Sequence, residues 1–332
     1  MKHFSKAILS LVMTAVLTAP LFSLTIKVGS IAPGGSPWDT ALKKIAAEWK
    51  TISGGTIDMK IYPGGIVGNE PDMIRKMRIG QLHAAIFTGV GMSYIAPEVF
   101  SLSLPFLIHD DGELEYIMKK TTPQFNRLIE KKGFSTLVWS KAGWVSLFST
   151  KPVVYPRDLK PLKISVSEGD AELLQSWRVM GYNAIPLSTN DLMTSLQNGM
   201  IEAFYAPPLV SASFQWFGIA RHMCNIKIAP MIGGFVVSKK TWDQVPAEMR
   251  PKLLRAAQKI VDNLYVETNA LEKKAIDTML KHGLKIHEVP ADAARLWQKE
   301  GNKGYDVFVG KTFSRDLLEK IQGYLKEYRN KK

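Results

Sequence analysis

Histidines, acidic residues and glycine-rich segments are the parts of this sequence that could do catalytic or metal chemistry. The glycine-rich stretch 64–68 lacks the Lys-Ser/Thr pair of a P-loop and the glycine spacing of a dinucleotide site. No serine occupies a Gly-x-Ser-x-Gly turn. The histidines beyond the N-terminal region show no metal-ligand spacing: His83, His109, His222, His282 and His287. We therefore expect no catalytic residue, no metal site and no cofactor, and no enzymatic activity. A secreted enzyme with scattered catalytic residues is the competing class.

Composition narrows the class of protein further. The chain has 332 residues, enough for about two domains. Its hydrophobic content of 46% and aromatic content of 10% exclude a disordered chain. A single cysteine, Cys224, excludes a disulfide scaffold and a cysteine-based zinc site. The net charge is +13, but no run exceeds two adjacent basic residues, so we expect a solvated basic surface and no nucleic-acid partner.

The N-terminus predicts the compartment. A basic start, Met1 to Lys6, leads into an apolar stretch from Ala7 to Leu17. This pattern is typical of a secretory signal peptide, and the stretch is shorter than the roughly 20 apolar residues of a spanning helix. We expect a signal peptide over residues 1–23 and a soluble, extracytoplasmic mature protein.

The elements that would position a site follow a strand–helix rhythm. Alternation predicts strands at 24–28 and 57–61 and an apolar strand at 84–87. Ser36 is a natural N-cap for a helix that begins at Pro37, and Pro71 opens a second helix. This order of elements indicates a parallel α/β unit.

The rhythm returns in the middle of the chain. Strands are predicted at 162–166, 183–187 and 200–205, with a helix at 173–180 and another capped by Asn190. Two such units indicate two similar lobes with a cleft between them. Ligands in open α/β sheets gather at the carboxyl ends of strands, so the loops after Val28, Phe87, Val166, Leu187 and Tyr205 are the candidate pocket.

A long amphipathic pattern runs from Pro246 to about Lys281. One helix of this length would span roughly 50 Å and brace both lobes. The alternative is two helices with a break near Thr268 and Asn269.

Several segments together resemble the extracytoplasmic solute-binding proteins of TRAP (tripartite ATP-independent periplasmic) transporters, the DctP-like family. They cover most of the mature chain in the expected order: Ser36-Pro37-Trp38, Tyr62-Pro63-Gly64-Gly65, Leu104-Pro105-Phe106-Leu107, the stretch from Lys151-Pro152 through Arg157-Asp158-Leu159-Lys160 to Ile164, Ser195-Leu196-Gln197-Asn198-Gly199 and Val237 to Trp242. The resemblance implies an α/β, two-lobed periplasmic-binding-protein-like fold with an interlobe cleft. It also implies delivery of a small-molecule ligand to TRAP membrane permease subunits from a periplasmic location.

The resemblance further implies an organic-acid ligand held by two arginines and an asparagine. This sequence has Val145, Ser165 and Ala206 at those three places. A carboxylate without a partner in a closed cleft costs several kcal/mol. Our hypothesis is therefore a hydrophobic or amphipathic ligand in an apolar cleft. The alternatives are an organic acid held by a displaced cation, with Lys141, Arg157 or Arg221 as candidates, and a binding protein of an ATP-driven ABC importer.

The expected ligand-binding residues combine the three motif positions with residues of the predicted pocket loops and their aromatic neighbours. They are Ile31, Trp38, Phe87, Thr88, Trp144, Val145, Phe148, Ser165, Thr189, Tyr205, Ala206, Phe214 and Trp216. By carry-over from the family, lobe I comprises residues 24–140 plus 232–270, and lobe II comprises 141–231 plus 271–332. Some members with unusual pockets work with a separate tetratricopeptide-repeat (TPR) lipoprotein, so by analogy such a lipoprotein is a candidate partner of this divergent member.

Overall fold

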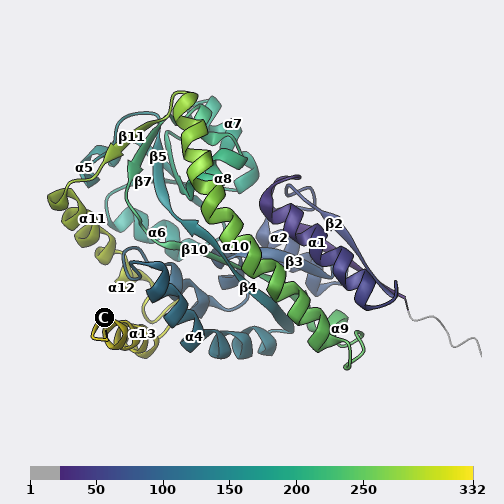
Figure 1. The fold of residues 1–332 in the computed structure, drawn as a ribbon. Coiled ribbons are helices and arrows are strands. Elements are labelled where there is room, and N and C mark those ends of the chain that lie inside the picture. The colour runs from purple at the N-terminus through teal and green to yellow at the C-terminus, as the bar shows by residue number, and fades with distance from the viewer. Residues whose placement is uncertain (1–22, 332) are drawn as a thin grey trace, which may run out of the picture.

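The structure is a computed structural model that describes residues 23–331 (Figure 1). The predicted signal peptide, residues 1–23, lies almost wholly outside the described residues. Within the described part, no helix combines the length and the apolar character needed to cross a membrane.

A five-stranded sheet forms the first half of the molecule, which we call lobe I. Its order is β2-β1-β3-β10-β4, with β1 parallel to β2 and β3, and β10 antiparallel to β3 and β4. The strands are β1 (Leu24–Ser30), β2 (Ile57–Tyr62), β3 (Ala84–Thr88), β4 (Phe134–Trp144) and β10 (Pro230–Ser238). The predicted parallel unit at the N-terminus is confirmed, whereas β4 and β10 were not predicted.

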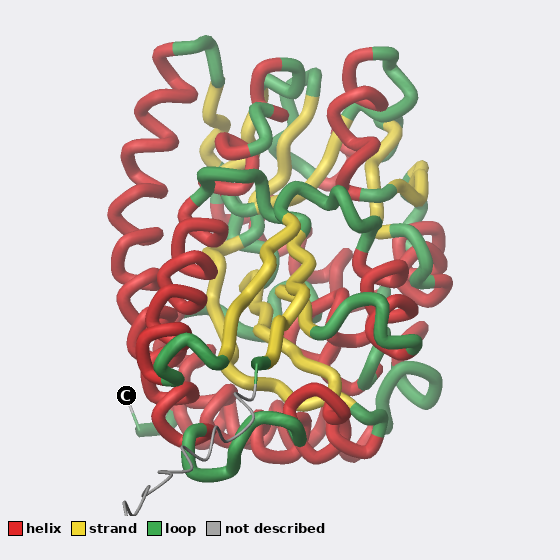
Figure 2. Tube along the Cα trace, turned by 90° about the vertical axis from the view of Figure 1, so that its right-hand side faces the viewer, coloured by secondary structure: helices red, strands yellow, loops and turns green. Residues whose placement is uncertain are grey.

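A six-stranded sheet forms the other half, lobe II, in the order β11-β9-β5-β8-β6-β7. The strands are β5 (Ser146–Ser149), β6 (Lys163–Ser167), β7 (Asn183–Leu187), β8 (Ala203–Ala206), β9 (His222–Asn225) and β11 (Lys285–Glu288). β6 pairs parallel with β7 and β8, as the repeated rhythm predicted. In Figure 2 the strands form an upper and a lower group, with helices around them.

Helices cover both sheets. Those that follow lobe I strands are α1 (Pro37–Ile52), α2 (Glu70–Arg78), α3 (Gly89–Ser93), η1 (Pro97–Ser103), α4 (Asp111–Lys131) and α9 (Lys239–Trp242). Those that follow lobe II strands are α5 (Pro156–Leu159), α6 (Ala171–Val179), η2 (Thr189–Asp191), α7 (Leu192–Gln197), α8 (Pro208–Ser213) and η3 (Trp216–Gly218). The chain ends with α11 (Ala291–Lys303), α12 (Tyr305–Phe308) and α13 (Arg315–Arg329).

Helix starts follow local side-chain chemistry. Ser36 accepts a hydrogen bond from the backbone of Asp39 and caps α1 as predicted. The predicted cap at Asn190 is wrong, because Ser188 caps the turn η2 that precedes α7.

One helix, α10 (Arg250–Lys281), links the two lobes. It is continuous through Thr268, so the two-helix alternative is wrong. Its 32 residues span about 48 Å, and it contacts α1 and β4 on one side of the molecule and α8 on the other (Figure 1). The predicted brace is therefore confirmed.

The chain passes from one sheet to the other at two crossings that lie beside each other. Val145 separates β4 from β5, and the segment Ile226–Ala229 separates β9 from β10. The amide of Val145 donates to Ala229 O at 2.9 Å, and the amide of Ile228 donates to Val145 O at 2.9 Å. These paired crossings and α10 make up the connection between the lobes. The residue division of the lobes stays a prediction, and the C-terminal helix α13 packs against α4.

An ion pair joins α13 to α4. Glu113, 5% exposed at its side chain, accepts from Arg329 Nε at 2.7 Å and from Arg329 Nη2 at 2.8 Å. The Arg329 guanidinium and the amide of His109 together hold the pKa of Glu113 below its usual value, against the effect of burial.

We expect Arg329→Ala to lower the free energy of unfolding by about 2 kcal/mol, because it leaves a buried carboxylate without its cation. Chemical denaturation measures this. The control is Arg315→Ala, whose exposed pair with Asp306 spans 3.9 Å and should change stability by less than about 0.5 kcal/mol. Equal effects of the two substitutions would contradict the prediction.

Candidate functional site

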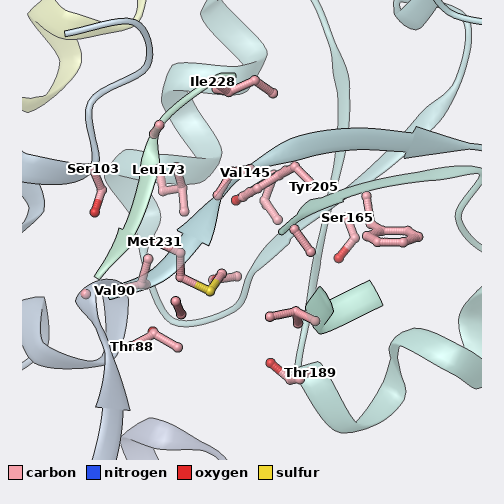
Figure 3. Close-up of a pocket in the computed structure, with 18 of the residues that line it drawn as sticks. Thr88, Val90, Ser103, Val145, Ser165, Leu173, Thr189, Tyr205, Ile228 and Met231 are labelled. Carbon is pink, nitrogen blue, oxygen red and sulfur yellow. The ribbon is translucent and has the colours of Figure 1, made fainter. Parts of the chain in front are cut away.

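A cavity of about 280 Å³ lies between the two lobes. Figure 3 shows Thr88 and Val90 approaching it from lobe I, and Ser165, Thr189 and Tyr205 from lobe II. Its size is close to the lower end for small-molecule sites, about 300 Å³.

The strand ends that the sequence singled out meet at this cavity. Residues that follow or end β1, β3, β6, β7 and β8 all line it: Ser30, Ile31, Ala32, Phe87, Thr88, Gly89, Val166, Ser167, Leu187, Ser188, Thr189, Tyr205 and Ala206. The parallel strands of each lobe point their carboxyl ends at the cleft, which explains this convergence.

Most of the predicted ligand-binding residues line the cavity. They are Ile31, Trp38, Phe87, Thr88, Val145, Ser165, Thr189, Tyr205, Ala206, Phe214 and Trp216. Trp144 and Phe148 do not, which corrects their predicted position. The Trp144 indole donates to Asp111 Oδ1 at 3.1 Å, and Phe148 stacks on Phe204 in the lobe II core. A strand alternates its side chains between two faces, and the sequence alone did not show which face meets the cleft. That the lining residues bind ligand stays a prediction.

The three motif positions come together. Val145 lies at the paired crossings, Ser165 on β6 and Ala206 at the end of β8, and all three are buried at the cavity wall. Residues far apart in sequence therefore converge on one space, with an apolar or a small hydroxyl side chain at each place.

Among residues 23–331, no lysine, arginine or histidine lines the cavity. The three candidate cations make other contacts. Lys141 lies over the Tyr265 ring with Nζ 3.8 Å from its centroid. Arg157 stacks on Tyr155, and Arg221 Nε donates to Gly218 O.

The ionisable carboxyls of the lining are Glu70 and Glu300. Glu70 Oε1 accepts from the Thr88 amide at 2.6 Å, and its Oε2 lies 3.0 Å from the Thr88 hydroxyl. Glu70 faces the cavity and is partly buried. Burial outweighs these two hydrogen bonds and raises the pKa of Glu70 to about 7.

The lining also offers neutral hydrogen-bonding groups. Hydroxyls come from Ser30, Thr88, Ser103, Ser140, Ser165, Ser167, Ser176, Ser188 and Thr189. The indole N–H of Trp38 is buried and donates to no described residue.

The lobes touch across the cleft. The Tyr94 hydroxyl of lobe I donates to Glu168 O of lobe II at 2.7 Å. Asn69 Nδ2 donates to Glu168 Oε1, and Gly65 packs against the Asn190 side chain.

Sequence reasoning missed several lining residues. Glu70 was missed because it lies at a helix start, next to Pro71, which was identified only as the residue that opens the helix. The C-terminal residues Gly301, Gly304 and Phe308 gave no signal, because only the tertiary fold brings them to the cleft.

The described part of the chain shows no cluster of metal-ligating side chains. His222 and His287 lie on adjacent strands with Nδ1 2.8 Å from Nε2, outside the cavity. No group of three or more His, Cys, Asp or Glu residues that could hold a metal ion occurs within residues 23–331.

Glu70 predicts a pH dependence of stability. The pKa of Glu70 is higher in the folded chain than the ordinary 4.5. Its stabilising contribution to the free energy of unfolding is therefore complete below about pH 4.5 and is lost as the pH rises towards 7. Between pH 5 and pH 8 the free energy of unfolding of the wild type should fall by about 2 kcal/mol relative to that of Glu70→Gln. Urea unfolding at both pH values measures this, with the exposed Glu130→Gln as control. Parallel pH profiles of wild type and Glu70→Gln would contradict it.

Comparisons with known proteins agree on fold and family. A Chromohalobacter salexigens solute-binding protein is 27% identical over 286 residues, 84% of this chain and 83% of that protein. The 2,3-diketo-L-gulonate-binding periplasmic protein of Escherichia coli is 23% identical, covering 90% of each chain.

Solved structures show the same two-lobed fold, which confirms the predicted fold class. A TRAP periplasmic solute-binding protein from Chromohalobacter salexigens with bound D-glucuronate has a TM-score of 0.83 and 25% identity, covering 91% of this chain and 99% of that one. One from Sulfurospirillum deleyianum with bound succinate has a TM-score of 0.83 and 20% identity, covering 90% and 98%. The family model for bacterial extracellular solute-binding protein, family 7, matches residues 28–312. The chain therefore belongs to this family, the DctP-type solute-binding proteins of TRAP transporters, as the sequence motifs indicated.

Proposed function

We propose that this protein is a periplasmic TRAP solute-binding protein whose cavity takes a mostly apolar, uncharged or amphipathic small molecule. The observation that carries the proposal is the lining, in which the described chain places hydroxyls, aliphatic and aromatic side chains but no cation. A carboxylate sealed in this cavity would lose its hydration without gaining a cationic partner. Glu70 and Glu300 are the ionisable carboxyls there; an ionised Glu70 would repel an anion, whereas Glu300 is paired with Lys160 and Lys303.

A second candidate ligand is an organic acid. The relatives favour it, since the solved structures hold D-glucuronate and succinate. On the comparisons alone it is the better supported of the two. Here an acid would need a cation moved into the cleft, and Lys141, Arg157 and Arg221 are engaged elsewhere. The family match gives no support to the ABC-importer alternative.

The remaining assignments follow from the family and the N-terminus. Export by a cleaved signal peptide over residues 1–23 would place the protein in the periplasm, where it would deliver its ligand to TRAP permease subunits. The TPR lipoprotein partner stays a prediction.

A ligand panel separates the two candidates. We expect 1-alkanols and aromatic alcohols to bind the purified protein, and succinate and D-glucuronate to bind at least about 100-fold more weakly, because an unpaired buried carboxylate costs several kcal/mol. Isothermal titration calorimetry measures both.

Paired variants show whether binding occurs in the cavity. Thr189→Trp should abolish binding by filling the cavity, whereas Thr40→Trp on the exposed face of α1 should leave it unchanged. Tight binding of succinate or D-glucuronate that Thr189→Trp abolishes would establish the organic-acid candidate instead.

Closure of the lobes gives a further prediction. Tyr94→Phe removes a hydrogen bond between the lobes and should weaken ligand binding about 2- to 10-fold, through faster release. Stopped-flow release kinetics check this. Tyr324→Phe, on α13, is the control and should leave the release rate unchanged.

A further inference from the structure

The cavity extends beyond the cleft between the sheets. Part of its lining comes from α6 and the residues that follow it, and from the C-terminal helices α11 and α12. We call this part the side arm and define it by Ser176, Trp177, Met180, Tyr182, Gly301, Gly304 and Phe308. Phe106 closes it from the loop after η1.

Two glycines in the wall of the side arm allow neighbouring side chains to pack closely there. A Cβ atom at Gly301 would lie 2.8 Å from Phe106 Cδ2, and one at Gly304 would lie 3.4 Å from Ser176 Cβ and 3.5 Å from Met180 Sδ. Neither glycine has a positive φ, so backbone conformation does not require them. Gly301 therefore leaves room for the Phe106 ring that closes the side arm, and a larger side chain at Gly304 would reach Ser176 and Met180 of its wall.

A row of aromatic rings leads from the cleft into the side arm. Tyr205, at the end of β8, stacks on Trp177 with ring centroids 5.4 Å apart. Trp177 in turn meets Tyr182 edge-on at 5.3 Å. All three rings line the cavity, so one wall is continuously aromatic from the strand ends to the side arm.

The Tyr182 hydroxyl has no hydrogen-bond partner among the described residues, although the residue is 95% buried. An unpaired buried polar group costs free energy that a bound molecule can recover by pairing with it. The carboxyl of Glu300 also lines this part of the cavity, and its ion pairs with Lys160 and Lys303 involve lysines outside the lining. An uncharged hydrogen-bonding end group would pair with the Tyr182 hydroxyl without bringing a further charge to this ion-paired carboxyl.

We propose that the side arm is a second subsite that takes the apolar chain of an elongated ligand, with an uncharged hydrogen-bonding group at its far end paired to Tyr182. This proposal rests on the proposed function and adds the length of the ligand and the chemistry of its end. The cleft would hold one polar end among the hydroxyls of Thr88, Ser165 and Thr189, and the aromatic row would cover the chain between the two ends.

Two homologous series test the proposal: 1-alkanols of increasing length and the α,ω-diols of equal length. For the wild type, affinity should rise about fourfold per added methylene while the chain fills the side arm. Gly304→Leu places a side chain in the side arm, so its affinities should stop rising at a shorter chain while short alkanols bind as before. Gly323→Leu is the matched control, because a Cβ at this α13 glycine meets open space.

Two milder variants keep the test valid if Gly304→Leu misfolds. Gly304→Ala adds one methyl group at ordinary contact distance and should weaken only the longest probes. Tyr182→Phe should lower the affinity for long diols about 2- to 10-fold relative to 1-alkanols of equal length.

The outcomes are separable from those of the ligand panel. Failure of every alkanol to bind the wild type overturns the proposed function and this inference with it. Alkanol binding whose length dependence is the same in Gly304→Leu, Gly304→Ala and Gly323→Leu overturns the side arm alone. Long fatty-acid anions that bind more tightly than the diols overturn the uncharged end group.

Discussion

An ionised group that is buried between the lobes needs a counter-charge in the same space. Water is displaced when two lobes meet, and an ion that loses its hydration without a counter-charge is costly. Glu70 shows this constraint acting on the protein itself. It takes two hydrogen bonds from Thr88, yet burial still raises its pKa to about 7. A ligand carboxylate would face the same penalty, so the lining decides which ligand charges the cleft tolerates.

The position of Val145 ties the site to the connection between the lobes. Its backbone pairs with Ile228 and Ala229 where both strands cross between lobes, and the residue lines the cavity. The connection between the lobes therefore borders the site itself. The helix α10 adds a second connection, because it packs on α1 and β4 as well as on α8. The hydrogen bond from Tyr94 to Glu168 joins the two lobes across the cleft.

Local chemistry made much of the fold predictable from the sequence. Caps such as Ser36 and alternation in β1 and β2 identified elements of the first sheet, and the rule for carboxyl ends of strands identified the strand ends that meet at the cavity. What escaped prediction depends on tertiary contacts. β10 enters the first sheet from a distant part of the chain, and Trp144 and Phe148 turn to the core face of their strands. Glu70, Gly301 and Gly304 carry no periodic signal, since their role comes from what packs opposite them.

Likeness of fold does not determine the charge of the ligand. The backbone brings β4, β6 and β8 to one cavity, and the structures that hold acids share that backbone with TM-scores of about 0.83. The family resemblance puts cations at positions 145 and 165, where this chain has valine and serine. The same closure that strengthens an arginine–carboxylate pair makes an unpaired carboxylate more costly. The charge that such a cleft can pair therefore depends on a few lining side chains and not on the arrangement of helices and strands.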